Sequence, residues 1–283
     1  MRDPISVEGV QFSESRLSIE EGVDLRLFEW KPGRDTGAEP ILFVAGWISL
    51  VTGWRPLLER LVQTRSVYYL ETREKRSAEI DRRLMRPASF SIPRLAEDLI
   101  VAADLLGLDG DRTVLFGSSM GSNAILEALK NGRLSAKAAF LVGPNAEFFF
   151  PWWGRPLVHL PAWVYSMAKP FVLWYLRNFR VNAREDPDQM ARYVRTVRSA
   201  DPKRIMLSAR AVIDYQALPG LETISTPVAV AYAGSDRLHG EGEVRRLVDA
   251  MPRGSAVSCP SNTYMHTAAV VADLEKYLAG LAP

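Results

Sequence analysis

Residues 113–121 read TVLFGSSMG, and this stretch decides the fold. Its first four residues are β-prone, its last five fit the pattern G-x-S-x-G, and a helical pattern follows from Met120 to Lys130. A strand that turns sharply into a helix is the setting of a nucleophile elbow, where flanking glycines relieve the crowding around a strained serine. We predict that Ser119 is a nucleophile, with its Oγ above a sheet and beside the positive end of the helix dipole. The alternative is a glycine-flanked turn with incidental serines.

Short apolar strands alternate with amphipathic helices on both sides of this stretch. A hairpin is predicted first, from two β-prone runs that flank Glu21-Gly22. Strands that are apolar on both faces indicate a parallel sheet covered by helices on both sides, so we predict an α/β fold with an opening antiparallel hairpin. The predicted strands are Leu17–Glu20, Val23–Trp30, Ile41–Ala45, Val67–Leu70, Thr113–Phe116, Ala138–Val142, Val228–Ala233 and Ala256–Cys259, and the helices are Trp54–Gln63, Ile92–Leu106, Met120–Lys130, Glu243–Ala250 and Thr267–Leu278.

The alternation breaks between Gly143 and about Leu218, where no strand stands out. Residues 144–215 hold 13 of the 27 aromatic residues and carry 11 Lys and Arg against 6 Asp and Glu. We therefore predict a helical cap at 144–218, inserted into an α/β core made of residues 1–143 and 219–283.

A serine nucleophile needs a base, and the sequence contains three histidines, His159, His239 and His266. The carboxyl ends of parallel strands share one edge of a sheet, which is where Ser119 is expected. His266 follows the last predicted strand and a polar loop, so it is the favoured base. The alternative for His266 is a structural role.

The base in turn needs a carboxylate that fixes its tautomer. Asp236 follows the strand Val228–Ala233 directly, again at a carboxyl end. Asp201 and Asp214 are rivals, but both lie in the insertion. An aspartate in an ordinary turn is the alternative for Asp236.

With the order Ser119, Asp236, His266 the chain resembles the α/β-hydrolase superfamily over nearly its whole length, and most of all the monoacylglycerol-lipase and carboxylesterase branch. The resemblance implies a serine hydrolase that cleaves small carboxylic esters of apolar acyl or alkyl groups through an acyl-enzyme. It also implies an oxyanion hole from the backbone N–H groups of Met120 and Trp47. Ala45 departs from the His-Gly pattern that is frequent in this loop. A thioesterase, an acyltransferase and a non-catalytic lipid- or partner-binding member of the fold are the alternatives.

Two charged stretches and a group of aromatic residues are left open. The run Glu71–Ser77 stands where many relatives carry an Asp and glycines, and we expect a solvated, salt-bridged surface there, with a role facing the substrate as the alternative. Three arginines recur every third residue on a predicted helix and indicate a solvated face or, alternatively, contact with an anionic surface. Trp152 and Trp153 are predicted to line a substrate pocket, although packing of the cap is the competing interpretation. The three arginines are Arg192, Arg195 and Arg198.

Composition excludes several classes. The 35 Lys and Arg minus 33 Asp and Glu leave a net charge of +2, too small for a dedicated nucleic-acid binder. One cysteine, Cys259, allows no internal disulfide, and neither metal-ligand spacing nor a phosphate-binding glycine loop is present, so no metal or cofactor is expected.

The most apolar run, Val158–Leu176, contains Pro161, Lys169 and Pro170 and is not expected to span a membrane. The first residues contain no apolar segment of a secretory signal, so a cytoplasmic protein is expected. Peripheral contact of the cap with a membrane surface or lipid is the remaining expectation for a partner.

Overall fold

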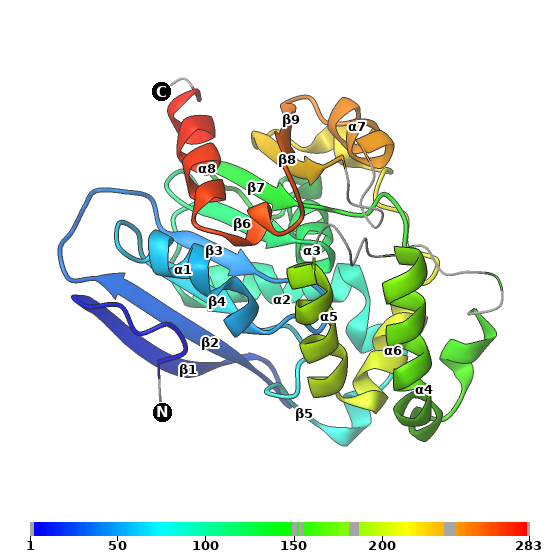
Figure 1. The fold of residues 1–283 in the computed structure, drawn as a ribbon. Helices are drawn as coiled ribbons and strands as arrows, with labels where there is room; N and C mark the ends of the chain where they lie inside the picture. Colours follow the sequence, from blue (N-terminus) through cyan, green and yellow to red (C-terminus); the bar gives the residue numbers. More distant parts are fainter. Residues whose placement is uncertain (1–2, 149–151, 153–154, 181–186, 235–240, 282–283) are drawn as a thin grey trace.

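A mixed β-sheet forms the centre of the molecule (Figure 1). The computed structural model describes residues 3–148, 152, 155–180, 187–234 and 241–281. Within these, the strand order is β1-β2-β4-β3-β6-β7-β8-β9, and the short β5 pairs with β2. The strands are β1 Val10–Glu20, β2 Val23–Pro32, β3 Ile41–Val44, β4 Val67–Leu70, β5 Glu79–Ile80, β6 Val114–Ser118, β7 Ala138–Val142, β8 Val228–Ala233 and β9 Gly254–Cys259.

The sheet combines an antiparallel edge with a parallel body. Strand β2 pairs antiparallel with β1 and with β4. The pairs β4–β3, β3–β6, β6–β7, β7–β8 and β8–β9 are all parallel. The predicted fold class, a mostly parallel sheet with an opening hairpin, is confirmed. Strand β6 continues two residues beyond its predicted end, because Gly117 and Ser118 still pair with Leu141 and Val142 of β7.

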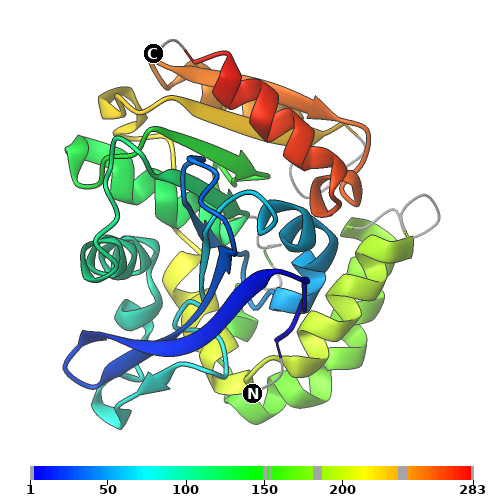
Figure 2. The ribbon, with the colours of Figure 1, turned by 90° about the vertical axis from the view of Figure 1, so that its left-hand side faces the viewer.

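Helices cover both faces of the sheet, and the side chains of β3 show why. Leu42 and Val44 point into a core shared with the helices α2, α3 and α7, while Ile41 and Phe43 point into a second core with α1 and α8. Alternation with period two thus buries both faces of one strand. Figures 1 and 2 show the sheet between these two layers. The helices are α1 Arg55–Leu61, α2 Ile92–Leu105, α3 Met120–Leu129, α7 Glu241–Asp249 and α8 Ala269–Ala279.

Three further helices lie between β7 and β8 in the chain: α4 Ala162–Tyr175, α5 Pro187–Ser199 and α6 Pro202–Val212. Helix α4 contacts both α5 and α6. They stand together beside the sheet, on the side to which the arrows of β3 and β7 point (Figure 1). We call α4, α5 and α6 with their connections the cap helices. None of the helices described is both long and apolar enough to cross a bilayer.

Candidate active site

Ser119 lies at the junction of β6 and α3, where the chain reverses. Its backbone has φ 47° and ψ −118°, a conformation that few residues other than glycine adopt. The backbone N–H of Ser119 donates to the carbonyl of Val142 at 2.8 Å, which ties the turn to the end of β7. A strained residue held by its surroundings is a feature of functional sites.

Close backbone approaches around this turn leave no room for side chains. A Cβ at Gly121 would lie 2.1 Å from the carbonyl oxygen of Val44, and one at Gly117 would lie 2.8 Å from a main-chain atom of α3. A Cβ at Gly46 would lie 3.3 Å from the Cβ of Ser119. Gly121 of the motif therefore allows the start of α3 to lie against the end of β3. Gly46 allows the loop after β3 to lie close to Ser119.

The two residues expected to supply an oxyanion hole lie at the start of α3 and in the loop after β3. Met120 is fully buried as the first residue of α3. Trp47 follows Gly46 in the loop after β3, and its indole N–H donates to the hydroxyl of Ser208 in α6 at 2.8 Å. The cap helices thus contact this loop directly.

Asn145 is a residue of the site that the sequence analysis missed. Its Nδ2 donates to Ser119 Oγ at 3.3 Å. A reciprocal pair orients it, because the N–H of Asn145 donates to Asn123 Oδ1 at 3.0 Å and Asn123 Nδ2 donates to the carbonyl of Asn145 at 2.7 Å. Asn145 stands three residues beyond the end of β7, the same edge position that singled out Asp236, so strand ends could have indicated it.

His266 lies at the end of a short 3₁₀ turn, Tyr264–His266, after β9. Its ring stacks on the buried indole of Trp54, with centroids 4.1 Å apart and an angle of 22° between the planes. Nδ1 lies 3.0 Å from the carbonyl oxygen of Asn262. Since a carbonyl can only accept, this contact is a hydrogen bond when Nδ1 carries the proton.

The cap also grips the loop that carries His266. Arg192 of α5 donates to Asn262 Oδ1 at 2.7 Å and to Thr263 Oγ1 at 3.0 Å. Of the three periodic arginines, Arg195 and Arg198 are exposed, but Arg192 is only half-exposed and turned to this loop. The stripe is therefore not one uniform solvated face.

Of the three candidates for the carboxylate, the structure describes Asp201 and Asp214. Asp236 lies outside the described residues. Asp214 is exposed and pairs with Arg155 at the surface, and the side chain of Asp201 caps α6 by accepting from the N–H of Arg204 at 3.0 Å. Both rivals therefore have other partners.

Ser119 and His266 line one cavity of about 730 Å³. Its wall is mainly apolar, with residues from the loop after β3 and from α4, α5 and α6. Burial raises the pKa of Tyr165 in this wall to about 12, so its phenol stays neutral at physiological pH. Phe148 lines the cavity too, whereas Trp152 is 83% exposed and not among the lining residues. Two other candidate residues, Trp153 and His239, lie outside the described residues. His159 is exposed on the surface.

The charged run Glu71–Ser77 is buried, so the expectation of a solvated surface is wrong. Five consecutive residues, Glu71 to Lys75, are at most 6% exposed, and only Arg76 is fully exposed. The reason is that each buried charge is paired: Glu71 and Arg73 pair with residues of other elements, and Glu74 and Lys75 pair with each other. Arg73 forms a two-pronged ion pair with Asp98 of α2, at 2.5 and 2.7 Å, and Arg26 of β2 binds Glu71. Burial acts to lower the pKa of Arg73, but the hydrogen bonds and the charge of Asp98 raise it by more. The pKa of Arg73 therefore lies above its ordinary value.

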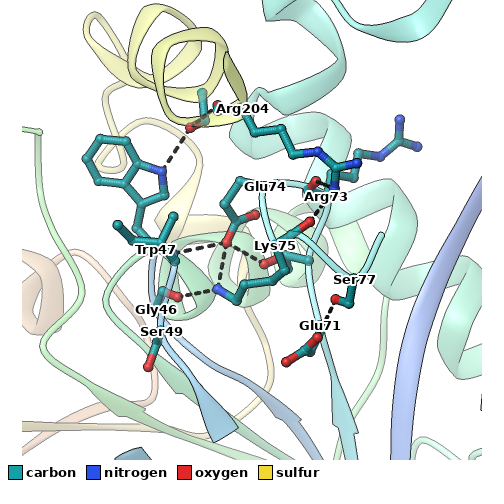
Figure 3. A network of polar contacts seen from close by, with 12 residues as sticks. Gly46, Trp47, Ser49, Glu71, Arg73, Glu74, Lys75, Ser77 and Arg204 are labelled. Carbon is teal, nitrogen blue, oxygen red and sulfur yellow. Dashed lines mark hydrogen bonds and ion pairs between the residues drawn. The ribbon is translucent and has the colours of Figure 1, made fainter. Parts of the chain in front are cut away.

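Glu74 and Lys75 bind the loop after β3, as Figure 3 shows. Lys75 Nζ donates to the carbonyl of Gly46 at 2.7 Å and to Glu74 Oε1 at 2.7 Å, while that oxygen accepts from the N–H of Ile48 at 3.3 Å. Ile48 has φ 50°, which is unfavourable for a β-branched residue. The turn is closed by Ser49 N–H, which donates to the carbonyl of Gly46 at 3.0 Å. A buried ion pair thus supports a strained turn.

A cap residue completes this network. The guanidinium of Arg204 in α6 donates to the carbonyls of Arg73, Lys75 and Ala78, at 3.3 Å for Arg73 and 2.8 Å for Ala78. These carbonyls belong to an irregular buried segment and would otherwise lack strand partners. Figure 3 shows Arg204 reaching into the loop from α6. The cap, the charged run and the loop after β3 therefore form one connected unit.

No cluster of three or more His, Cys, Asp or Glu side chains that could hold a metal ion occurs in the described part of the chain. Ser119 and His266 share a cavity whose lining is mainly apolar.

No protein-family model and no curated protein sequence matches the chain. Solved structures do match it across nearly its full length. An esterase from Thermogutta terrifontis superposes with a TM-score of 0.73 at 19% identity, covering 95% of this chain and 98% of that one. A hydrolase from Oleispira antarctica gives 0.73 at 15%, covering 90% and 94%, and an enol-lactonase from Burkholderia xenovorans LB400 gives 0.72 at 17%, covering 94% and 97%. The chain has the α/β-hydrolase fold.

Replacing Lys75 tests the support of the loop after β3. Lys75→Met removes the donor to Gly46 and leaves the buried carboxylate of Glu74 without its cation, so we expect the free energy of unfolding to fall by about 3–5 kcal/mol. Arg76→Met is the matched control, because the adjacent Arg76 is exposed and should change it by less than about 0.5 kcal/mol. Urea unfolding followed by circular dichroism measures both. Equal, small losses would show that the pair does not hold the turn.

Proposed function

We propose that this protein is a serine hydrolase that cleaves carboxylic esters of apolar acyl or alkyl groups. The observation that carries the proposal is the strained conformation of Ser119 at the strand–helix junction, with its side chain on the same cavity as His266. The esterase, hydrolase and enol-lactonase that share the fold support hydrolysis as the reaction type. A cytoplasmic location is part of the proposal, because a sequence with one cysteine has no internal disulfide that an oxidising compartment would have to maintain.

In the proposed reaction, Ser119 Oγ attacks the ester carbonyl carbon while His266 Nε2 takes the hydroxyl proton. The tetrahedral intermediate collapses, its C–O bond to the alcohol breaks, and His266 returns the proton to the departing alcohol. An acyl group now bonded to Ser119 remains. Water then attacks it with His266 again as the base, and the acid leaves with Ser119 restored.

Backbone N–H groups are assigned to the negative charge of the intermediate. Met120 at the start of α3 and Trp47 in the loop after β3 are the proposed donors, and the helix dipole of α3 adds to them. Oxyanion donors act through fixed geometry. The Glu74–Lys75 pair contacts the main chain on both sides of Trp47, at Gly46 and Ile48, and is proposed to keep the Trp47 N–H in place. Asn145 donates to Ser119 Oγ in the resting site and orients the hydroxyl.

Ser119→Ala should lower kcat for p-nitrophenyl esters by a factor on the order of 10⁴ or more, because the covalent route is lost. Ser118→Ala is the control, since Ser118 is the buried last residue of β6 and is expected to retain activity. Covalent labelling by a fluorophosphonate probe should follow the same pattern. A Ser118→Ala variant that loses labelling while Ser119→Ala keeps it would refute the assignment.

Asp236 is proposed as the residue that orients His266. Asp236→Asn should reduce kcat by a factor on the order of 10³–10⁴ with little change in KM, because an amide favours the wrong tautomer of the imidazole. Asp214→Asn serves as the comparison, because Asp214 is exposed and paired with Arg155. Steady-state kinetics of both variants decide the matter. If Asp214→Asn is the inactive one, the acid lies in the cap.

The apolar wall of the cavity is the basis for the proposed substrate class. Each additional buried CH₂ of an acyl chain contributes about 0.8 kcal/mol, or roughly fourfold in affinity, so kcat/KM should rise from p-nitrophenyl acetate to octanoate. Phe148→Ala should reduce the octanoate-to-acetate ratio, because Phe148 lines the cavity, and Trp152→Ala should not. The ratio is insensitive to a general loss of stability. A flat series in the unchanged protein would contradict an apolar acyl pocket.

A further inference from the structure

Helix α4 exposes a row of large apolar side chains to solvent. Trp163 is 64% exposed, Met167 73% and Trp174 53%. Met167 and Trp174 lie four and eleven positions after Trp163, which places all three on one face of an α-helix. We call this row, with the neighbouring exposed Phe179, the outer face of the cap. Phe171, 48% exposed, adjoins the row and also lines the cavity beside Ser119.

The opposite side of the same helix is apolar as well. Val164, Tyr165, Ala168 and Val172 line the cavity beside Ser119. A helix that is apolar all round is normally buried on every side, yet no residue of α4 falls in the buried class. The cavity accounts for the apolar side chains on this inner face of α4. It does not account for the exposed row on the other side of the helix.

Three exposed rings at the end of α4 and just beyond it contact one another. Phe171 and Trp174 stack with centroids 5.6 Å apart, and Trp174 meets Phe179 edge-on at 5.5 Å. A contiguous exposed apolar patch of this kind marks an interaction surface rather than scattered surface residues.

The charge of the segment selects the partner. From Phe148 to Arg184 the sequence contains no Asp and no Glu, although the whole chain has 33 of them. The same segment contains five cationic side chains; Arg155 is paired with Asp214, and Arg177 is exposed directly beyond the end of α4. The five are Arg155, Lys169, Arg177, Arg180 and Arg184.

A second copy of the chain is a poor occupant for such a surface. A twofold dimer sets the same patch against itself, so the cations of one copy would face those of the other. An anionic bilayer offers the complementary charge, and tryptophan is enriched at the boundary between headgroups and acyl chains. The exposed apolar row of α4 suits insertion among acyl chains, and the exposed Arg177 beyond its end suits the headgroup level.

We propose that the outer face of the cap binds the surface of an anionic phospholipid bilayer. Binding places α4 in the interface plane, with Trp163, Met167 and Trp174 toward the acyl chains and Arg177 at the phosphates. Neither Ser119 nor the proposed reaction takes part, so the binding can be tested on its own.

Sedimentation with vesicles tests the proposal. The full chain should bind vesicles of equal parts phosphatidylcholine and phosphatidylglycerol more tightly than vesicles of phosphatidylcholine alone, and added salt should weaken the difference. Trp163→Ala and Trp174→Ala should each weaken binding about tenfold, because each removes a large exposed ring. Arg177→Glu should weaken binding to the anionic vesicles about fivefold or more.

Matched controls are available elsewhere on the surface. Leu105→Ala removes an exposed apolar side chain of α2, and Arg112→Glu reverses an exposed charge before β6, at the opposite edge of the sheet. Neither should alter vesicle binding. Met167→Gln provides a milder variant of the row that places no buried group at risk, and quenching of tryptophan fluorescence by brominated lipid in the unchanged protein reports insertion directly.

Three results would overturn the proposal. The first is no binding of the unchanged protein to anionic vesicles, and the second is binding that the outer-face variants leave unaltered while a control variant removes it. The third is self-association in light scattering that depends on Trp163 and Trp174 and persists without lipid, which would assign the outer face to a second copy of the chain.

Discussion

The close approach of the start of α3 to the end of β3 is the constraint on which the site depends. With a Cβ on Gly121 only 2.1 Å from the carbonyl oxygen of Val44, no other residue fits there without displacing the strand or the helix. That approach forces the sharp turn at Ser119 and places the loop after β3 beside it. The strain of one residue is therefore held by the packing of two neighbouring strands of the sheet.

A second strained residue, Ile48, lies in the loop that approaches Ser119 at Gly46, and it donates its N–H to a buried charged group. The carboxylate of Glu74 and the ammonium of Lys75 are both buried, and their contacts with the main chain at Gly46 and Ile48 offset the desolvation of the pair. Arg204 brings the cap into the same network through three main-chain carbonyls. Rigidity of the turn beside the nucleophile is thus shared between the sheet, the charged run and the cap.

The cap has two different apolar faces, and the difference separates two questions. Its inner face, with Tyr165 and Val172, closes the cavity and bears on the size and polarity of a substrate. Its outer face, with Trp163 and Trp174, is exposed and bears on what the protein rests against. One helix carries both faces, so a lipid surface contacting the outer face would lie one helix diameter, about 10 Å, from the cavity wall.

The sequence by itself determined the parallel sheet, the elbow at Ser119 and the positions of His266 and most strands, because these depend on local periodicity and on glycines needed where they stand. Strands β4, β7 and β8 have the predicted bounds. Only the tertiary structure decided that Glu71 to Lys75 are buried, because a run of charges can be buried only when distant residues such as Asp98 and Arg204 neutralise and bond it. It alone also turned Arg192 toward the loop of His266, since that contact does not follow from spacing along the chain. The position of Asn145 just beyond β7 could have indicated it, but its hydrogen bond to Ser119 is known only from the structure.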